Sequence, residues 1–245
     1  MFSLSWLPDP NNREPPGAYA IIYILKTISK YWLLIIGTSL AVITGFLTLY
    51  LHYHTYFPGD LRISLWVQMS ENRPLTLILE GLAWIFGSWH AAIPIVLSGV
   101  IIYWKLGKLE TLLIAAAGLF SLINEGIKVF IARPRPTADQ VRVLMSENSF
   151  SFPSSHAFFA CLFLGILIFI LIHRLKRSTL RTFVITILSV LALLVGFSRI
   201  YLGVHWYSDV IAGYIFGGFF LNLLIAGYMV LEKRRPKRFE EELSP

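Results

Sequence analysis

Long apolar stretches separated by short polar segments dominate the chain. A helix needs about 20 mostly apolar residues to cross the hydrocarbon core of a bilayer, because backbone groups left unpaired in lipid are costly. Six stretches come near this length, and they cover residues 31–51, 82–104, 111–131, 155–172, 182–198 and 210–231. The pattern therefore predicts an all-α, polytopic membrane protein built as a bundle of six transmembrane helices.

Amphipathic segments lie beside these stretches. Residues 18–29 are apolar enough to form a short helix in the membrane interface, within an N-terminal segment 1–30. Residues 57–69 alternate polar and apolar positions at near-helical spacing, which favours an amphipathic helix on the outer surface, with an irregular loop as the alternative. Residues 232–245 are expected to form a cytoplasmic tail. No internal repeat divides the chain, so we expect one domain over residues 1–245.

Composition and charge agree with a lipid environment and set an orientation. Hydrophobic residues make up 56% of the chain and charged residues 14%, whereas a soluble domain carries about 25% charged residues. Fourteen of the 21 Lys and Arg residues fall on one side of the predicted spans, and such an excess is typical of the cytoplasmic side. Both termini are therefore predicted to be cytoplasmic, and we expect no nucleic-acid partner for the net charge of +7. The seven remaining basic residues are Arg62, Arg73, Lys128, Arg133, Arg135, Arg142 and Arg199.

A first cluster of polar residues, Lys-Val-Phe-Ile-Ala-Arg-Pro-Arg-Pro, follows the third predicted span. Lys128 and Arg135 are seven residues apart, which is about two helical turns and therefore one helix face. Pro134 and Pro136 disfavour a continuous helix, so Arg135 is expected just beyond the helix end. The alternative is that these basic side chains only reach toward the interface.

A second cluster, Phe-Pro-Ser-Ser-His, precedes the fourth predicted span. Ser154 or Ser155 is a natural N-cap, and the first turn of the helix then offers unpaired N–H groups and the positive end of the helix dipole. A phosphate or another oxyanion suits such a position. His156 falls in this first turn. The alternative is a plain helix start with an incidental histidine.

A third cluster, Ser-Arg-Ile-Tyr-Leu-Gly-Val-His-Trp-Tyr-Ser-Asp, joins the last two predicted spans. His205 and Asp209 are four residues apart, so one helical turn would place the carboxylate beside the imidazole. A carboxylate on one ring nitrogen fixes the tautomer and raises the nucleophilicity of the other nitrogen. Arg199 supplies a permanently charged planar fork that matches phosphoryl oxygens. A purely structural His–Asp pair is the alternative.

All three clusters map to the outer membrane face, where they bring together the groups that phosphoryl transfer needs: cations, a nucleophile and an acid. The pattern K-x6-RP, PSxH and SR-x5-H-x3-D, in this order and at membrane boundaries, resembles the type 2 phosphatidic acid phosphatase (PAP2) superfamily. The second motif is commonly PSGH in this family, and Ser155 replaces the glycine here. A serine amide can contact phosphate equally well when its φ is negative.

The resemblance implies a mechanism and a set of site residues. His205 attacks phosphorus to form a phosphohistidine, Asp209 orients His205, and His156 protonates the departing lipid oxygen. The phosphoryl oxygens are held by Lys128, Arg135, Arg199, Ser154 and the amide of Ser155. No metal and no cofactor are expected, and the outer face shows no carboxylate cluster suited to Mg²⁺.

The implied substrate is the phosphomonoester or pyrophosphate of a lipid in the cell membrane, of the undecaprenyl pyrophosphate, phosphatidylglycerol phosphate or phosphatidic acid type. The active site is expected on the extracytoplasmic side. A phosphotransferase of the same family, which passes the phosphoryl group to another lipid, remains an alternative because the sequence does not show the acceptor. A lipid or anion transporter would place polar residues through the helix middles, whereas four of the six spans are nearly uninterrupted apolar stretches.

Other polar and small residues are predicted to have structural roles. Arg133 and Arg142 are expected to be exposed loop arginines. For Asp60, in the outer loop, contact with the substrate is the less favoured alternative. Glu125 lies three residues before Lys128, so an intrahelical ion pair is expected.

Asn124 is expected to bond a neighbouring helix. The spacing of Gly213 and Gly217 predicts a close helix contact.

Overall fold

The computed structural model describes residues 16–69 and 72–233, so most of the predicted C-terminal tail and the first half of the predicted N-terminal segment lie outside the described residues. Within these ranges every regular element is a helix, which confirms the all-α class. The elements are α1 (Pro16–Tyr53), α2 (Asp60–Val67), α3 (Arg73–Ile85), η1 (Ser88–Ala91), α4 (Ala92–Lys105), α5 (Lys108–Ile131), α6 (Ser155–Arg174), α7 (Thr179–Tyr201) and α8 (Tyr207–Lys233).

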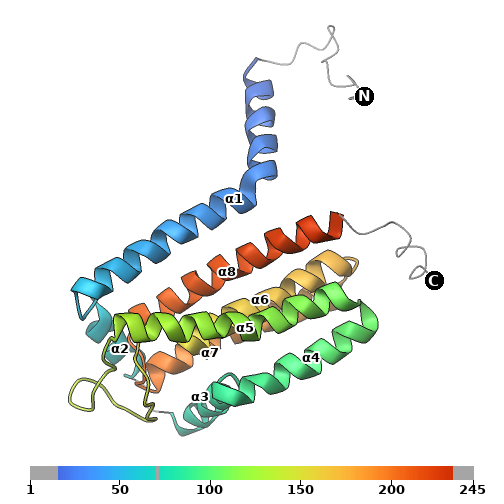
Figure 1. Ribbon diagram of the computed structural model, residues 1–245. Helices are drawn as coiled ribbons and strands as arrows, with labels where there is room; N and C mark the ends of the chain where they lie inside the picture. Colours follow the sequence, from blue (N-terminus) through green and yellow to red (C-terminus); the bar gives the residue numbers. More distant parts are fainter. Residues whose placement is uncertain (1–15, 70–71, 234–245) are drawn as a thin grey trace, which may run out of the picture.

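Helix α6 is the centre of the bundle. It packs against α5, α7 and α8, while α1 covers α8 and α4 covers α5 (Figure 1). Phe158, Phe163 and Ile166 of α6 are fully buried in this core. By contrast, large apolar side chains on the outer helices, such as Leu122 and Leu193, are exposed, as expected where lipid is the solvent. Among the described residues, five helices are long and apolar enough to cross a membrane.

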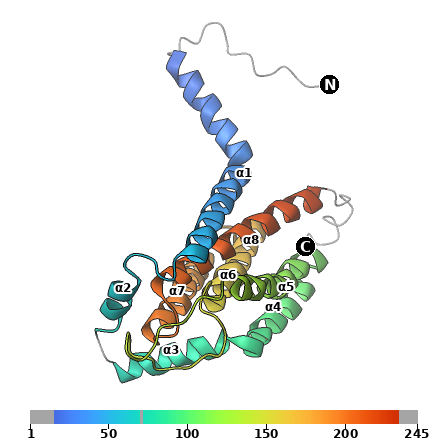
Figure 2. The ribbon, with the colours of Figure 1, turned by 60° about the vertical axis from the view of Figure 1, so that its left-hand side comes forward.

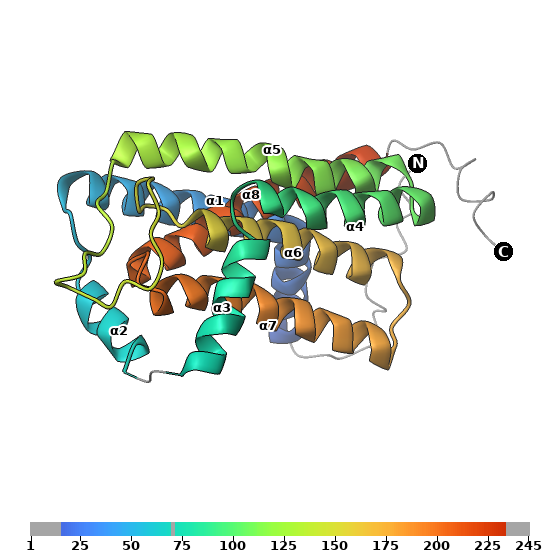
Figure 3. The ribbon, with the colours of Figure 1, turned by 90° about the horizontal axis from the view of Figure 1, so that it is seen from below.

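The predicted span 82–104 is not one straight helix. Helix α3 ends at Ile85, and the segment Trp89–Lys105 runs at 74° to it. Gly87 lies at the break, where a Cβ atom would be 2.6 Å from the carbonyl oxygen of Ala83 and 2.8 Å from Nε2 of His156. The expected sixth span is therefore present only if the helices on the two sides of the break, Arg73–Ile85 and Trp89–Lys105, are counted as one span. The bend allows α3 to cross α7 near one end of the bundle (Figure 3).

The two predicted amphipathic segments are both helical. Residues 18–29 belong to α1, which continues without a break into the first span and bends along its course (Figure 2). Residues 60–67 form α2, whose polar Asp60 and Ser64 are buried while Leu65 and Trp66 are exposed. An apolar outer face suits a helix that lies at a membrane surface.

Glycines on α8 allow the close contact with α6 that their spacing predicts. A Cβ atom at Gly213 would be 2.7 Å from the carbonyl oxygen of Ser154, and one at Gly217 would be 2.7 Å from that of Phe158. The start of α8 is consequently held beside the start of α6, where the amide of Ser154 donates to the carbonyl oxygen of Asp209 at 3.0 Å.

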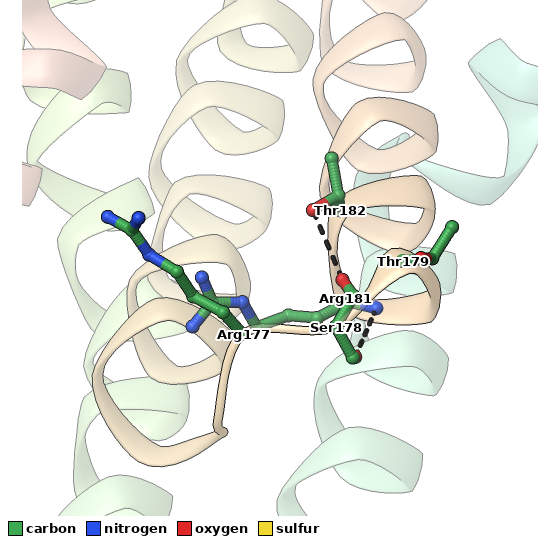
Figure 4. Close-up of a pocket in the computed structure, with 5 residues that line it drawn as sticks. All are labelled: Arg177, Ser178, Thr179, Arg181 and Thr182. Atoms are coloured by element: carbon green, nitrogen blue, oxygen red, sulfur yellow. Dashed lines mark hydrogen bonds between the residues drawn. The ribbon is translucent and has the colours of Figure 1, made fainter.

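The three sequence clusters meet at one end of the bundle, together with α2 and α3 (Figure 3). The α6–α7 turn lies at the other end. There, an open pocket is lined by Arg177, Ser178, Thr179, Arg181 and Thr182 (Figure 4). Ser178 caps α7 by accepting a hydrogen bond from the amide of Arg181 at 3.1 Å. The basic residues of this pocket are among those that the sequence pattern assigns to the cytoplasm.

Candidate active site

The first cluster is positioned by the end of α5. Ala132 follows the helix in a left-handed conformation, with φ of 51°, and its amide donates to the carbonyl oxygen of Lys128 at 2.8 Å. The chain therefore turns sharply before Pro134, and Arg135 lies beyond the helix end, as the proline pattern predicts. Lys128 is in the last turn of α5 and is only 4% exposed.

The third cluster is a tight turn between α7 and α8. Gly203 has a φ of 72°, and a Cβ atom there would lie 2.2 Å from the carbonyl oxygen of Arg142, so only glycine fits. The amides of Val204 and His205 both donate to the carbonyl oxygen of Arg199 at 3.2 Å. These contacts place the His205 ring between the end of α7 and the start of α8.

One face of the His205 ring meets Asp209, as their spacing predicts. Nδ1 of His205 is 3.6 Å from Oδ2 of Asp209, and both side chains are buried. Ser151 bridges them: its hydroxyl donates to Oδ2 at 2.5 Å and lies 3.4 Å from Nδ1. The amide of Trp206 also donates to Oδ2 at 2.9 Å. The carboxylate is therefore fixed beside Nδ1, and Nε2 lies on the opposite edge of the ring.

The other ring nitrogen faces a pair of arginines that share one carboxylate. Nη1 of Arg135 is 3.1 Å from Nε2 of His205, and Nη2 of Arg135 is 2.7 Å from Oε2 of Glu147. The other carboxylate oxygen of Glu147, Oε1, forms an ion pair with the buried guanidinium of Arg199. Oε2 also lies 3.9 Å from Nε2 of His205. An anion thus occupies the space in front of the imidazole.

Lys128 belongs to the same cationic group. Its ammonium lies 3.4 Å from the hydroxyl of Ser149, which also accepts from Nη2 of Arg135 at 3.0 Å. Lys128 pairs with Glu125 at 3.7 Å, which confirms the expected intrahelical pair. The three basic residues predicted as phosphate ligands are therefore gathered around Glu147 and Ser149.

The second cluster starts α6. Ser154 is the N-cap by position, but its buried hydroxyl has no hydrogen-bond partner within the described residues. Ser155 is helical, so its φ is negative, and its hydroxyl donates to Glu125 at 2.6 Å and accepts from Asn124 at 3.0 Å. The predicted bond of Asn124 to another helix is thereby confirmed.

His156 is buried next to α3. Its Nε2 lies 3.1 Å from the carbonyl oxygen of Ala83. Arg199, Glu147 and Lys128 are close enough to interact electrostatically with its ring. In the part of the chain that the structure describes, the ring bonds α3 and not His205.

Arg133 corrects an expectation. Its place in the sequence predicts an exposed loop arginine, but the side chain is 2% exposed and forms ion pairs with Asp60 and Asp209. The left-handed turn at Ala132 aims the residue inward, and its two carboxylate partners come from distant parts of the chain. Glu147 is a second residue that the sequence motifs do not predict. The signal for it is the imbalance of charge in the motifs, which contain three basic phosphate ligands and one carboxylate, Asp209.

Electrostatics favour a neutral His205 and a charged Glu147. Burial, followed by the positive charge of Arg135, holds the pKa of His205 well below its usual value of 6.5. Burial alone would raise the pKa of Glu147, but the positive charge of Arg199, with a further contribution from Arg135, outweighs burial and lowers the pKa to about 2. A neutral imidazole has a lone pair for attack on an electrophile.

Residues 16–69 and 72–233 contain no group of three or more His, Cys, Asp or Glu side chains arranged to hold a metal ion. Fold and site together define a polytopic helical membrane protein. Its buried His–Asp pair faces a group of basic side chains that can bind an anion.

Comparisons with known proteins place this chain in a family. The model of the PAP2 superfamily matches residues 109–232, which is about half of the chain and includes all three clusters. The chain belongs to the PAP2 superfamily. Phosphatidylglycerophosphatase B of Bacillus subtilis (strain 168) is 36% identical over 132 residues, which are 54% of this chain and 61% of that relative, so the match spans less than two thirds of the relative's length.

Two solved structures are similar. A transmembrane PAP2-type phosphatidylglycerolphosphate phosphatase from Bacillus subtilis has 28% sequence identity and a TM-score of 0.70, over 81% of this chain and 98% of that one. LpxE from Aquifex aeolicus has 22% identity and a TM-score of 0.52, over 68% of this chain and 96% of that one, and this likeness concerns the fold.

Proposed function

We propose that the protein is an integral membrane lipid phosphatase that hydrolyses a lipid phosphomonoester or pyrophosphate through a phosphohistidine on His205. One observation carries this proposal: an anion, the Glu147 carboxylate, is held by Arg135 and Arg199 directly in front of Nε2 of His205. Two guanidinium groups match the oxygens of a phosphoryl group as well as those of a carboxylate.

The proposed reaction starts when the phosphoryl group of the lipid replaces the Glu147 carboxylate. Arg135, Arg199 and Lys128 then spread the charge of the phosphoryl oxygens. The hydroxyl of Ser154 and the amide of Ser155 supply further donors at the start of α6.

Nε2 of His205 attacks phosphorus, so that an N–P bond forms while the P–O bond to the lipid breaks. The positive charge that develops on the imidazole is stabilised by Asp209 at Nδ1. His156 gives a proton to the departing lipid oxygen. Its Nε2–H donates to the carbonyl oxygen of Ala83, so the transferred proton comes from Nδ1 and His156 must be doubly protonated before the P–O bond breaks. Water then cleaves the N–P bond and releases phosphate.

The lipid class is proposed from the relatives. The curated relative and the first of the two solved structures are both from Bacillus subtilis and both named for phosphatidylglycerol phosphate. Phosphatidylglycerol phosphate is therefore the first substrate to test, beside undecaprenyl pyrophosphate and phosphatidic acid. A phosphotransferase would use the same phosphohistidine and differ in the acceptor.

The membrane face is also a proposal. The end of the bundle opposite to His205 holds Lys105, Lys108, Arg174, Arg177 and Arg181. Such an excess of basic residues is typical of the cytoplasmic side, which supports an extracytoplasmic active site and cytoplasmic termini.

The test is release of inorganic phosphate by purified protein in detergent with EDTA, across a panel of the three lipid classes. We expect the wild type and the control His173→Ala, at the far end of α6, to release phosphate, and His205→Ala to lose the activity. Activity of His205→Ala close to wild type would contradict the role of His205. Loss of wild-type activity on EDTA addition would contradict the expected metal-free mechanism.

A further inference from the structure

We propose that Arg133 and Asp60 are positioning residues for the phosphoryl transfer, which act through Asp209 on the nucleophile His205. The inference rests on the proposed function. Arg133 lies in the first cluster but is not one of the specified positions of the K-x6-RP pattern, and Asp60 lies outside all three clusters. Neither residue contacts Glu147, where the phosphoryl group is proposed to bind.

The contacts of Arg133 fix its guanidinium in one orientation. Nη1 donates to Oδ1 of Asp209 and, at 2.9 Å, to the hydroxyl of Ser208. Nη2 donates to Oδ2 of Asp60 at 2.5 Å, and Nε donates to the carbonyl oxygen of Thr55 at 2.9 Å. An arginine bonded on three of its nitrogens cannot turn without breaking several charge-assisted hydrogen bonds.

Asp60 anchors this guanidinium to two helices. Its Oδ2 accepts from the amide of Phe57 at 2.8 Å and from the hydroxyl of Ser208 at 2.9 Å. Its Oδ1 accepts from the amide of Ser208 at 2.9 Å, in the first turn of α8. A carboxylate is favourable at a helix N-terminus. Asp60 therefore ties the start of α2 to the start of α8, the turn that carries Asp209.

The two oxygens of Asp209 are divided between two tasks. Oδ1 is held by Arg133, while Oδ2 accepts from Ser151 and faces Nδ1 of His205. Ser151 and the amide of Trp206 hold Oδ2, so without Arg133 the carboxylate is restrained through one oxygen only, about a terminal torsion that has no sharp minima of its own. The guanidinium thus selects the rotation in which Oδ2 meets the imidazole.

Charge gives the second reason. Asp209 and Asp60 are 0% and 2% exposed, and a buried carboxylate is costly unless a counter-charge is present. Arg133 is the cation that contacts both. A buried ion pair broken on one side leaves an uncompensated charge, so loss of Arg133 would favour a protonated Asp209. A neutral Asp209 stabilises the cationic phosphohistidine less well.

A double-mutant cycle tests the inference with the full-length protein in detergent. We expect Arg133→Gln to lower kcat by about 10- to 100-fold, the range typical of residues that orient a reacting side chain, while KM changes little. In an Asp209→Asn background the same substitution should change residual kcat by less than about twofold, because it acts through the missing carboxylate. Arg62→Gln, at an exposed position of α2, is the control and should keep wild-type kcat.

Asp60→Asn is the second variant, for use in the same cycle if Arg133→Gln does not fold; thermal unfolding in detergent monitors both. A purely structural role predicts equal effects of Arg133→Gln or Asp60→Asn in both backgrounds, and that result would overturn the inference while the proposed function stands. If neither the wild type nor Arg62→Gln releases phosphate from any of the lipids, the proposed function is overturned, and the inference with it.

Discussion

Glu147 bridges Arg135 and Arg199, and its Oε2 lies 3.9 Å from Nε2 of His205. The carboxylate thus occupies the two guanidinium groups that we propose as ligands of the phosphoryl group. Its pKa of about 2 means that the carboxylate stays charged at neutral and mildly acidic pH.

Replacing this carboxylate should strengthen anion binding. Hydrogen bonds to charged groups contribute about 1.5–3 kcal/mol, so we expect Glu147→Gln to lower the inhibition constant for orthovanadate by about tenfold. The control is Asp139→Asn on the same loop, an exposed residue that should leave the constant unchanged. An unchanged or raised inhibition constant in Glu147→Gln would show that Glu147 does not occupy the anion site.

Ser154 and Ser155 should respond differently to alanine. The buried hydroxyl of Ser154 has no partner within the described residues, so Ser154→Ala removes an unsatisfied group and should not lower the free energy of unfolding. The same change removes a donor to the phosphoryl group, and we expect kcat/KM to fall about tenfold.

Ser155→Ala instead breaks the bonds to Glu125 and Asn124, so it should destabilise the protein by about 1 kcal/mol. Both variants are compared by thermal unfolding and by phosphate release. The assignment of Ser154 to phosphate is wrong if Ser154→Ala loses stability and keeps full activity.

The ionisation of His205 sets the acid side of the pH profile. Its pKa lies well below 6.5. The imidazole is therefore neutral and able to attack even at pH values below the pKa of an ordinary histidine. The sign follows from linkage: the unfolded chain takes up a proton as the pH falls through 6.5, the folded protein does not, and the free energy of unfolding decreases toward acid.

The measurement is ¹⁵N NMR of the ring nitrogens, assigned by comparison with His205→Gln. We expect a titration midpoint below 6.5, and a midpoint at or above that value would contradict the described environment of the ring.

Much of the fold and site follows from local patterns. The apolar runs predict the helices, the spacing of His205 and Asp209 predicts their contact, and Pro134 predicts that Arg135 leaves the helix. These features depend on neighbours in sequence, which helical periodicity and backbone sterics control.

The remaining features depend on contacts between distant segments. At the break, the backbone of Gly87 lies against the ring of His156 from α6, a contact that the span 82–104 does not contain by itself. Arg133 is buried because Asp60 and Asp209 come from two other helices. Glu147 lies in a loop that has no periodic pattern. Only the excess of basic residues in the three clusters indicates that an acidic side chain lies near them.

The covalent state of His205 tests the central claim most directly. The protein is mixed with a lipid phosphate labelled with ³²P and quenched in alkali within the first turnover, because phosphohistidine is stable to base and labile to acid. We expect label on the wild-type peptide that contains His205, and none on His205→Asn. Label on another residue, or turnover without any labelled protein, would contradict the account.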